Sequence, residues 1–166
     1  MTNQSLPVDT ILAILKETPP RLANLTSGAA PAQLHAAPGI GEWSVHEVLA
    51  HLRACDDVWG NYYIMAILSQ DRPTIQARNP RTWIKDTDYL EQEFKFLLRA
   101  FTKQRRKLLA ALAPLSPRDW ARTNTLIGAG KPLQQTLLSH ADRLARHERA
   151  HLKQMERSIH ALQGTL

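Results

Sequence analysis

The amino-acid sequence predicts an all-α protein, a four-helix bundle whose helices are joined by long loops. Apolar residues recur at steps of three and four over four long segments, which is the period of a helix with one buried face. The 166 residues are 43% hydrophobic and include only 7 glycines, as is typical of a packed, helix-rich protein. No segment shows a strand pattern, and no internal repeat is present. We therefore expect a single domain over residues 1–166.

The first helical segment is expected to begin near Asp9 and to break at Pro19 and Pro20. Proline removes a backbone donor and clashes with the preceding turn, so a short second piece should follow these two residues. A loop rich in glycine, alanine and proline then covers residues 26–42.

The second helix has the clearest start in the chain. Ser44 can act as the N-cap and Glu47, three residues later, completes a capping box. The inward stripe that follows keeps a 3–4 spacing and consists of Val48, Leu52, Cys55, Trp59, Tyr62 and Ala66. Residues 71–86 contain two prolines and little periodicity, so we expect a loop there.

The third and fourth helices are expected over residues 87–113 and 132–162, with a long connection over residues 114–131. The third carries Leu90, Phe94, Leu97, Phe101, Leu108 and Leu112 on its inward face. The stripe of the fourth consists of Leu133, Leu137, His140, Leu144, His147, His151 and Met155. Three histidines thus occupy positions where a plain bundle would have leucine. The connections are longer than usual between helices, which favours a role for them in forming the walls of a functional site.

The five residues from His147 to His151 fit the H-E-x-x-H pattern of zinc peptidases. Residues at i and i+4 share one face of a helix, so both imidazoles could bind one ion. A peptidase is nevertheless disfavoured, because Gln154 and Arg157 occupy the positions where the metzincin pattern has glycine and histidine. We also expect no further helix after this one that could supply a glutamate ligand.

His51 is the best candidate for a third ligand, because it lies on the inward side of the second helix. His51, His147 and His151 would leave one coordination position open, as in catalytic zinc sites. Three neutral imidazoles suit Zn, Ni, Fe or Co without discriminating among them. Three core histidines in a plain bundle are the alternative.

The neighbouring polar groups are expected to play structural roles. His140 lies about 10.5 Å from His147 along a helix axis, too far to join the same ion, and is expected to be buried or at a pocket edge. Cys55 is expected to be a small core residue, with a thiolate ligand as the alternative. Glu148 is expected at the surface, with a general base as the alternative. The remaining groups expected at the surface, in loops or at helix ends are His35, His46, Asp56, Asp57 and His160.

The net charge of +6 is scattered along the chain, and its densest run, residues 103–107, is expected to be a solvated helix face. None of the common nucleic-acid-binding signatures is present, so we expect no nucleic-acid partner. No apolar run is long enough for a membrane span and no leader is evident. The single cysteine, Cys55, suits a reducing compartment, and we expect a cytoplasmic protein.

Two segments resemble a known family. Residues 43–52, WSVHEVLAHL, resemble the W-S-x-x-E-x-x-x-H-L signature of the DinB-like (YfiT-type) superfamily, and residues 146–154, RHERAHLKQ, resemble its R-H-x-x-x-H-x-x-Q terminus. The resemblance implies an up-down-down-up four-helix bundle, a divalent metal held by His51, His147 and His151, and in many members a homodimer.

The resemblance also implies a chemistry, since some members are similar to S-transferases that use bacillithiol or mycothiol. The leading hypothesis is a metal-dependent enzyme that transfers a low-molecular-weight thiol cosubstrate to an electrophilic small molecule. The metal, Zn, Ni or Fe, would lower the pKa of the thiol. A metal-dependent hydrolase and a non-catalytic metal-binding stress-response module are the alternatives.

Overall fold

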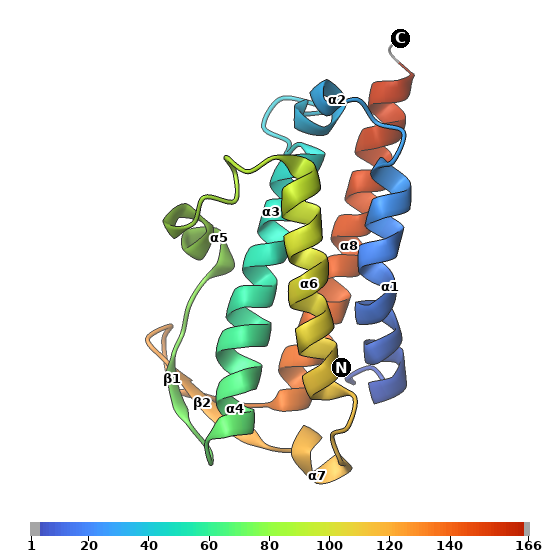
Figure 1. Cartoon of the computed structure of the whole chain (residues 1–166). Coiled ribbons are helices and arrows are strands. Elements are labelled where there is room, and N and C mark those ends of the chain that lie inside the picture. The colour runs from blue at the N-terminus through green and yellow to red at the C-terminus, as the bar shows by residue number, and fades with distance from the viewer. Residues whose placement is uncertain (1–3, 165–166) are drawn as a thin grey trace.

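Four long helical rods make up the computed structural model, which describes residues 4–164 (Figure 1). They are α1 (Val8–Thr26); α3 (Val45–Cys55) with its continuation through η1 (Asp56–Ile64) and α4 (Met65–Ser69); α6 (Phe94–Leu112); and α8 (Leu137–Gln163). In Figure 1 the chain runs upward in α1 and α8 and downward in the other two rods. The rods at α1 and α3 each pack against both α6 and α8. The predicted four-helix bundle is confirmed in its architecture.

The second rod begins as the sequence predicts. Ser44 is the N-cap, its Oγ accepts a hydrogen bond from the backbone N–H of Glu47 (3.2 Å), and Glu47 Oε2 accepts one from the Ser44 N–H (2.7 Å). The rod then widens into a π-helical turn over η1, an arrangement that is rare in proteins and often found near functional sites. The sequence pattern did not reveal this widening.

The expected break in the first helix is wrong, since α1 continues through Pro19 and Pro20. Proline at position 19 leaves the Leu15 carbonyl without its usual helical donor. Arg105 of α6 donates from Nη1 to that carbonyl oxygen (2.9 Å), so the freed acceptor is satisfied by a neighbouring helix. A tertiary contact of this kind cannot be read from the local sequence.

A small sheet also contradicts the expectation that the chain has no strands. It contains β1 (Thr74–Gln76), β2 (Thr123–Ile127) and β3 (Leu133–Thr136), in the order β1-β2-β3. The β1–β2 pair is parallel and β2–β3 is antiparallel, with Gly128 and Gly130 at positive φ in the turn between β2 and β3. These strands are too short to show a period in the sequence, and each depends on its partners for hydrogen bonds.

Two helices begin later than predicted because their first residues belong to other structures. Leu133 lies in β3 and is 52% exposed, and α8 starts at Leu137 after the N-cap Thr136. Leu90 is 46% exposed and precedes α6, which starts at Phe94. Neither leucine takes the inward position that the periodic pattern assigned to it.

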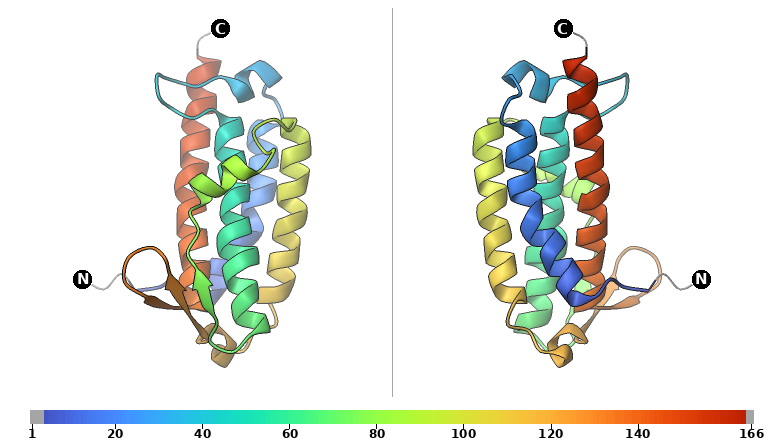
Figure 2. Two further views of the ribbon diagram at one scale, coloured as in Figure 1. Left: turned by 90° about the vertical axis from the view of Figure 1, so that its left-hand side faces the viewer. Right: turned by 90° about the vertical axis from the view of Figure 1, so that its right-hand side faces the viewer.

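The long connections carry short elements of their own. These are α2 (Pro31–His35), α5 (Pro80–Trp83), η2 (Ile84–Asp86) and α7 (Pro117–Trp120). The left view of Figure 2 shows the α5 segment lying across α3, with α8 beside it. The segment over residues 71–86, expected to be a loop, thus contains a strand and a helical wall over the second rod.

The apolar core is divided into two clusters along the bundle. On α8, Leu144 belongs to one cluster and Leu152 to the other, and His147 and Glu148 lie between them. A polar layer therefore crosses the bundle at this level. None of the helices within residues 4–164 is both long and apolar enough to cross a membrane.

Candidate metal centre

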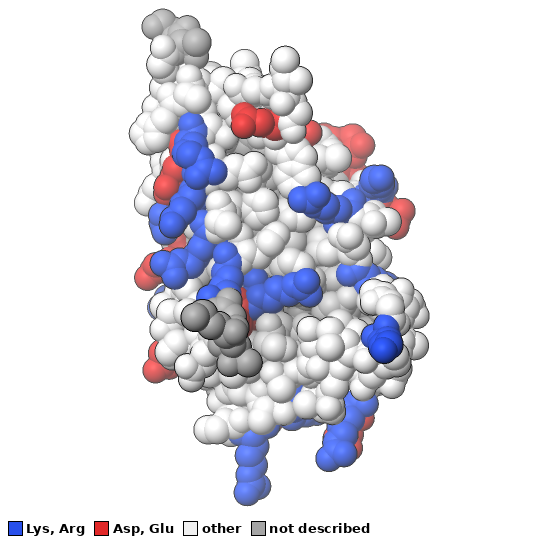
Figure 3. Space-filling model, turned by 180° about the vertical axis from the view of Figure 1, so that it is seen from behind, with Lys and Arg blue, Asp and Glu red and all other residues white. Residues whose placement is uncertain are grey.

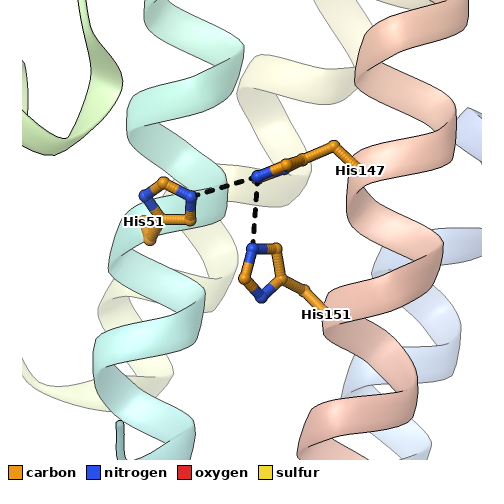
Figure 4. Close-up of side chains that lie close together, drawn as sticks. All are labelled: His51, His147 and His151. Atoms are coloured by element: carbon orange, nitrogen blue, oxygen red, sulfur yellow. Dashed lines mark hydrogen bonds between the residues drawn. The ribbon is translucent and has the colours of Figure 1, made fainter.

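The three predicted histidines meet in the polar layer. His51 comes from α3, and His147 and His151 lie one turn apart on α8, with all three rings pointing into the space between the two helices (Figure 4). His147 Nε2 lies 3.4 Å from His51 Nε2 and 3.3 Å from His151 Nε2. One nitrogen from each residue falls within 4.8 Å of the others, so the structure brings the three together.

The spacing of these nitrogens fits a metal ion. A tetrahedral ion with metal–nitrogen bonds of about 2.0–2.1 Å holds its ligand nitrogens about 3.3–3.4 Å apart. Hydrogen bonding among the rings is a poor alternative, because His147 Nε2 carries either one hydrogen or one lone pair and faces two nitrogens. A cation shared by the three lone pairs suits this donor set.

All three rings are held in the neutral form that a metal requires. Burial, followed by the charge of His151, lowers the pKa of His51 to about 4. Burial together with the charges of His151 and His51 lowers the pKa of His147 to about 3. The pKa of His151 is also lowered, mainly by burial. At neutral pH each imidazole therefore keeps one lone pair for a metal.

The Nδ1 atoms of His151 and His51, which are not part of the cluster of Nε2 atoms, differ in their hydrogen bonding. His151 Nδ1 lies 2.8 Å from Gln154 Oε1, an acceptor that fixes the hydrogen on Nδ1 and leaves the lone pair on Nε2. Gln154 is the last residue of the R-H-x-x-x-H-x-x-Q terminus, but the sequence alone did not indicate that it contacts a histidine. His51 Nδ1 is buried and has no hydrogen-bond partner among the described residues.

Cys55 is fully buried beside the cluster, as expected of a small core residue. Its Sγ lies 3.5 Å from His51 Nε2 and 3.8 Å from His147 Nδ1. Burial, reinforced by the negative charges of Asp56 and Glu148, raises the pKa of the thiol. The thiol therefore stays protonated at neutral pH, which makes it a poor ligand in this state.

Glu148 and Asp56 are buried, and the expectation that they lie at the surface is wrong. Arg105, itself 1% exposed, donates to Asp56 (2.7 and 3.0 Å) and to Glu148 (2.6 and 3.1 Å), while the Thr18 hydroxyl donates to Glu148 (2.5 Å). Burial raises the pKa of Glu148 to about 7, and Arg105 opposes that shift. In a bundle each helix faces two neighbours, so a residue one step away from the histidine stripe is still inside.

The same network corrects the picture of the basic run over residues 103–107. Arg105 points into the core, whereas Lys103, Arg106 and Lys107 are exposed as expected. Figure 3 shows one face of the molecule on which basic and acidic side chains are interspersed and form no single continuous patch.

Two tryptophans pack on the histidine cluster, and an arginine lies over each. The Trp43 ring contacts His51 edge-on (5.1 Å between centroids) and stacks on His151 (6.3 Å), and the Arg81 guanidinium lies 5.1 Å from its centroid. The Trp59 ring contacts His147 edge-on (4.9 Å), and the Arg143 guanidinium lies 4.9 Å from its centroid. Nothing in the sequence marked Arg81, because it lies in a segment expected to be a loop.

The remaining histidines stay outside the cluster. His140 is buried and its Nε2 lies 2.9 Å from Oδ1 of Asn124 in β2, which confirms that it is a buried histidine. His46 is 2% exposed, with Nε2 3.2 Å from the Leu90 carbonyl oxygen, so the expectation of a partly exposed helix end is wrong. His35, whose ring stacks on that of His46, and His160 are exposed.

Comparison with known proteins identifies the family and agrees with the fold. A family model described as the DinB superfamily matches residues 14–155, most of the chain. The chain belongs to the DinB superfamily. Among solved structures it is similar to one described as "YfiT from Bacillus subtilis is a probable metal-dependent hydrolase with an unusual four-helix bundle topology". That match has a TM-score of 0.77 at 18% identity and covers 95% of this chain and 90% of the other. A search of curated proteins gave no match.

Proposed function

We propose that this DinB-superfamily protein binds one divalent metal ion through His51, His147 and His151. We also propose that it is an enzyme that transfers a low-molecular-weight thiol to an electrophilic small molecule. The observation that carries the proposal is the convergence of three imidazole nitrogens at metal-ligand spacing. His147 and His151 are only partly buried, which is consistent with a coordination position open to a small molecule.

A divalent cation in such a site lowers the pKa of a coordinated thiol or water and so supplies a nucleophile at neutral pH. The protein supplies three neutral ligands, whose rings are oriented by Gln154 and by the two tryptophans. Glu148, the glutamate of the H-E-x-x-H pattern, points into the ion network with Arg105 and is not available as a base. Thiol transfer suits this arrangement, because a thiolate needs no further base before it attacks the electrophile.

Hydrolysis is the second candidate, and one contact favours it. Glu47 lines a small hollow together with His51, Trp43 and Arg81, so a carboxylate lies near one ligand. Its Oε2 also accepts the Ser44 N–H in the capping box. The solved structure of similar fold is described as a probable metal-dependent hydrolase, which supports testing water as the nucleophile.

The metal site is tested by elemental analysis of protein without a histidine tag. We expect about one equivalent of Zn, Ni or Fe in the natural protein and none in the His147→Ala/His151→Ala variant. His160→Ala is the matched control, because His160 is an exposed histidine near the end of the same helix. Helix content measured by circular dichroism should be the same in all three. Equal metal in all three proteins, or none in any after reconstitution, would contradict the site.

The reaction is tested on the metal-loaded protein with 2-mercaptoethanol and 1-chloro-2,4-dinitrobenzene, and separately with p-nitrophenyl acetate. Thiol transfer predicts metal-dependent formation of the thioether, whereas hydrolysis predicts metal-dependent release of nitrophenol without thiol. Metal binding with neither activity would leave the non-catalytic metal-binding module.

A further inference from the structure

Two arginines flank the histidine cluster from different elements. Arg81 belongs to α5 and Arg143 to α8, four residues before His147 and therefore on the same helix face. Each guanidinium lies over a tryptophan, Trp43 or Trp59, that itself contacts the ligand rings. The cluster thus has a cation on either side, each held at a defined place by an aromatic ring.

The side-chain hydrogen-bond donors of these two arginines have no partner in the part of the chain that the structure describes. Within residues 4–164, neither the Arg81 nor the Arg143 side chain makes a hydrogen bond or an ion pair, and both residues are exposed. Arg105 and Arg146, in contrast, are both paired with carboxylates. Two guanidinium groups without carboxylate partners near a cation site leave positive charge that an anionic ligand would balance.

The segment that carries Arg81 is fixed to the second rod. The Tyr63 hydroxyl donates to the Arg78 carbonyl (3.1 Å) and accepts from the Arg78 N–H (2.7 Å). Trp83 Nε1 donates to Asp57 Oδ2 (3.1 Å), and Asn79 Oδ1 caps α5 by accepting the Arg81 N–H (2.9 Å). Both Tyr63 and Asp57 belong to the π-helical turn η1, which gives that unusual turn a role in positioning the arginine.

The two hollows next to these arginines differ in charge, and the one beside Arg143 is basic. Arg143 lines one of about 340 Å³ together with Arg78, Lys131 and Trp59, and no carboxylate of the described residues lines it. Arg81 lines a smaller one, of about 130 Å³, together with His51 and one carboxylate, that of Glu47. The larger volume is sufficient for a small molecule.

We infer that Arg81 and Arg143 bind the carboxylate groups of a small-molecule substrate whose reacting end lies at the three histidines. The inference rests on the proposed function for the reacting end and assigns the class of substrate, a molecule with one or more carboxylates. Guanidinium groups recognise carboxylates through paired N–H donors, which gives orientation as well as affinity. Arg81 and Arg143 are therefore specificity-determining residues.

The test compares a charged and a neutral thiol on the zinc-loaded protein by calorimetry. Mercaptosuccinate, with two carboxylates, should bind about tenfold or more tightly than 2-mercaptoethanol. Arg81→Gln and Arg143→Gln should each weaken mercaptosuccinate binding about tenfold and leave 2-mercaptoethanol binding and zinc content unchanged. Arg118→Gln, which removes an exposed arginine in α7, is the matched control and should change neither.

A separate arm keeps this inference distinct from the proposed function. Succinate, which has no thiol, is titrated into metal-free protein and the same variants. If succinate binds and both Arg81→Gln and Arg143→Gln weaken that binding, the inference is supported even in a protein that retains no metal. Failure to retain metal would by itself overturn only the proposed function. Equal binding of the two thiols to zinc-loaded protein, unchanged in both variants, overturns the inference and leaves the metal site intact.

Discussion

His147 and Glu148 are adjacent in the sequence and lie in two different chemical environments. His147 points toward α3, where it meets two other imidazoles in a partly exposed cluster. Glu148 points toward α1 and α6, where it is fully buried and bonded to Thr18 and Arg105. One step along a helix turns the side chain by about 100°, and this step separates the candidate metal centre from a buried ion network.

The histidine cluster and the ion network formed by Arg105, Asp56 and Glu148 should therefore respond differently to mutation. The three histidines could hold a metal ion, whereas the charges of Arg105, Asp56 and Glu148 are balanced by one another. Loss of a histidine should cost metal binding with little loss of fold. Loss of a network member leaves buried charge without a partner and should cost stability.

The largest expected effect is that of Arg105→Met, which leaves Asp56 and Glu148 buried without their cation. We expect a loss of about 3–5 kcal/mol in the free energy of unfolding, measured by urea denaturation. The adjacent Arg106→Met removes an exposed arginine from the same helix and should change stability by less than about 0.5 kcal/mol. Equal stability of the two variants would show that the network is not needed for folding.

A smaller effect is expected from Gln154→Ala, which removes the acceptor at His151 Nδ1. Zinc affinity, measured by competition with a chelator, should fall about 10–100-fold, while the free energy of unfolding of the metal-free protein changes little. Gln163→Ala, at the exposed end of α8, is the matched control. An unchanged affinity in Gln154→Ala would show that this hydrogen bond does not position the ring.

The pH dependence sharpens the comparison further. In the folded protein the pKa of His51 is lowered from 6.5 to about 4, and that of His147 from 6.5 to about 3. Between these pKa values and pH 6.5 the unfolded chain therefore binds more protons than the folded protein. Stability of the metal-free protein should therefore fall as the pH falls below 6.5, by about 1 kcal/mol between pH 7 and pH 5.5 after allowance for the partial exposure of His147. Urea denaturation of His51→Asn/His147→Asn should show a shallower slope over this interval. The same slope in both proteins would contradict the assignment.

The smallest effect is expected at Cys55, which lies against the cluster but contributes packing. Cys55→Ala should lower the free energy of unfolding by about 0.5–1 kcal/mol and leave the zinc content unchanged. The raised pKa of the thiol also predicts slow reaction with iodoacetamide in the folded protein, compared with the urea-unfolded chain. Loss of zinc in Cys55→Ala would instead make the sulfur a ligand.

The sequence by itself determined the features that follow from local period and spacing. The 3–4 pattern predicted four helices, the Ser44 capping box fixed the start of the second, and the i, i+4 pair on α8 placed two imidazoles on one face. The inward position of His51 was also readable, because helix periodicity identifies which side of a rod is buried. These properties depend on residues within a few turns of one another.

Tertiary structure decided what depends on partners far away in the chain. Arg105 satisfies the carbonyl that Pro19 frees, which allows α1 to continue, and it also makes Glu148 an interior residue. The three short strands form only in pairs, across about 50 residues of chain for β1 and β2. The position of Arg81 beside the histidines likewise depends on anchoring of its segment to η1. Burial and long-range hydrogen bonds outweigh local propensity at each of these positions, and they become visible only once the helices are packed together.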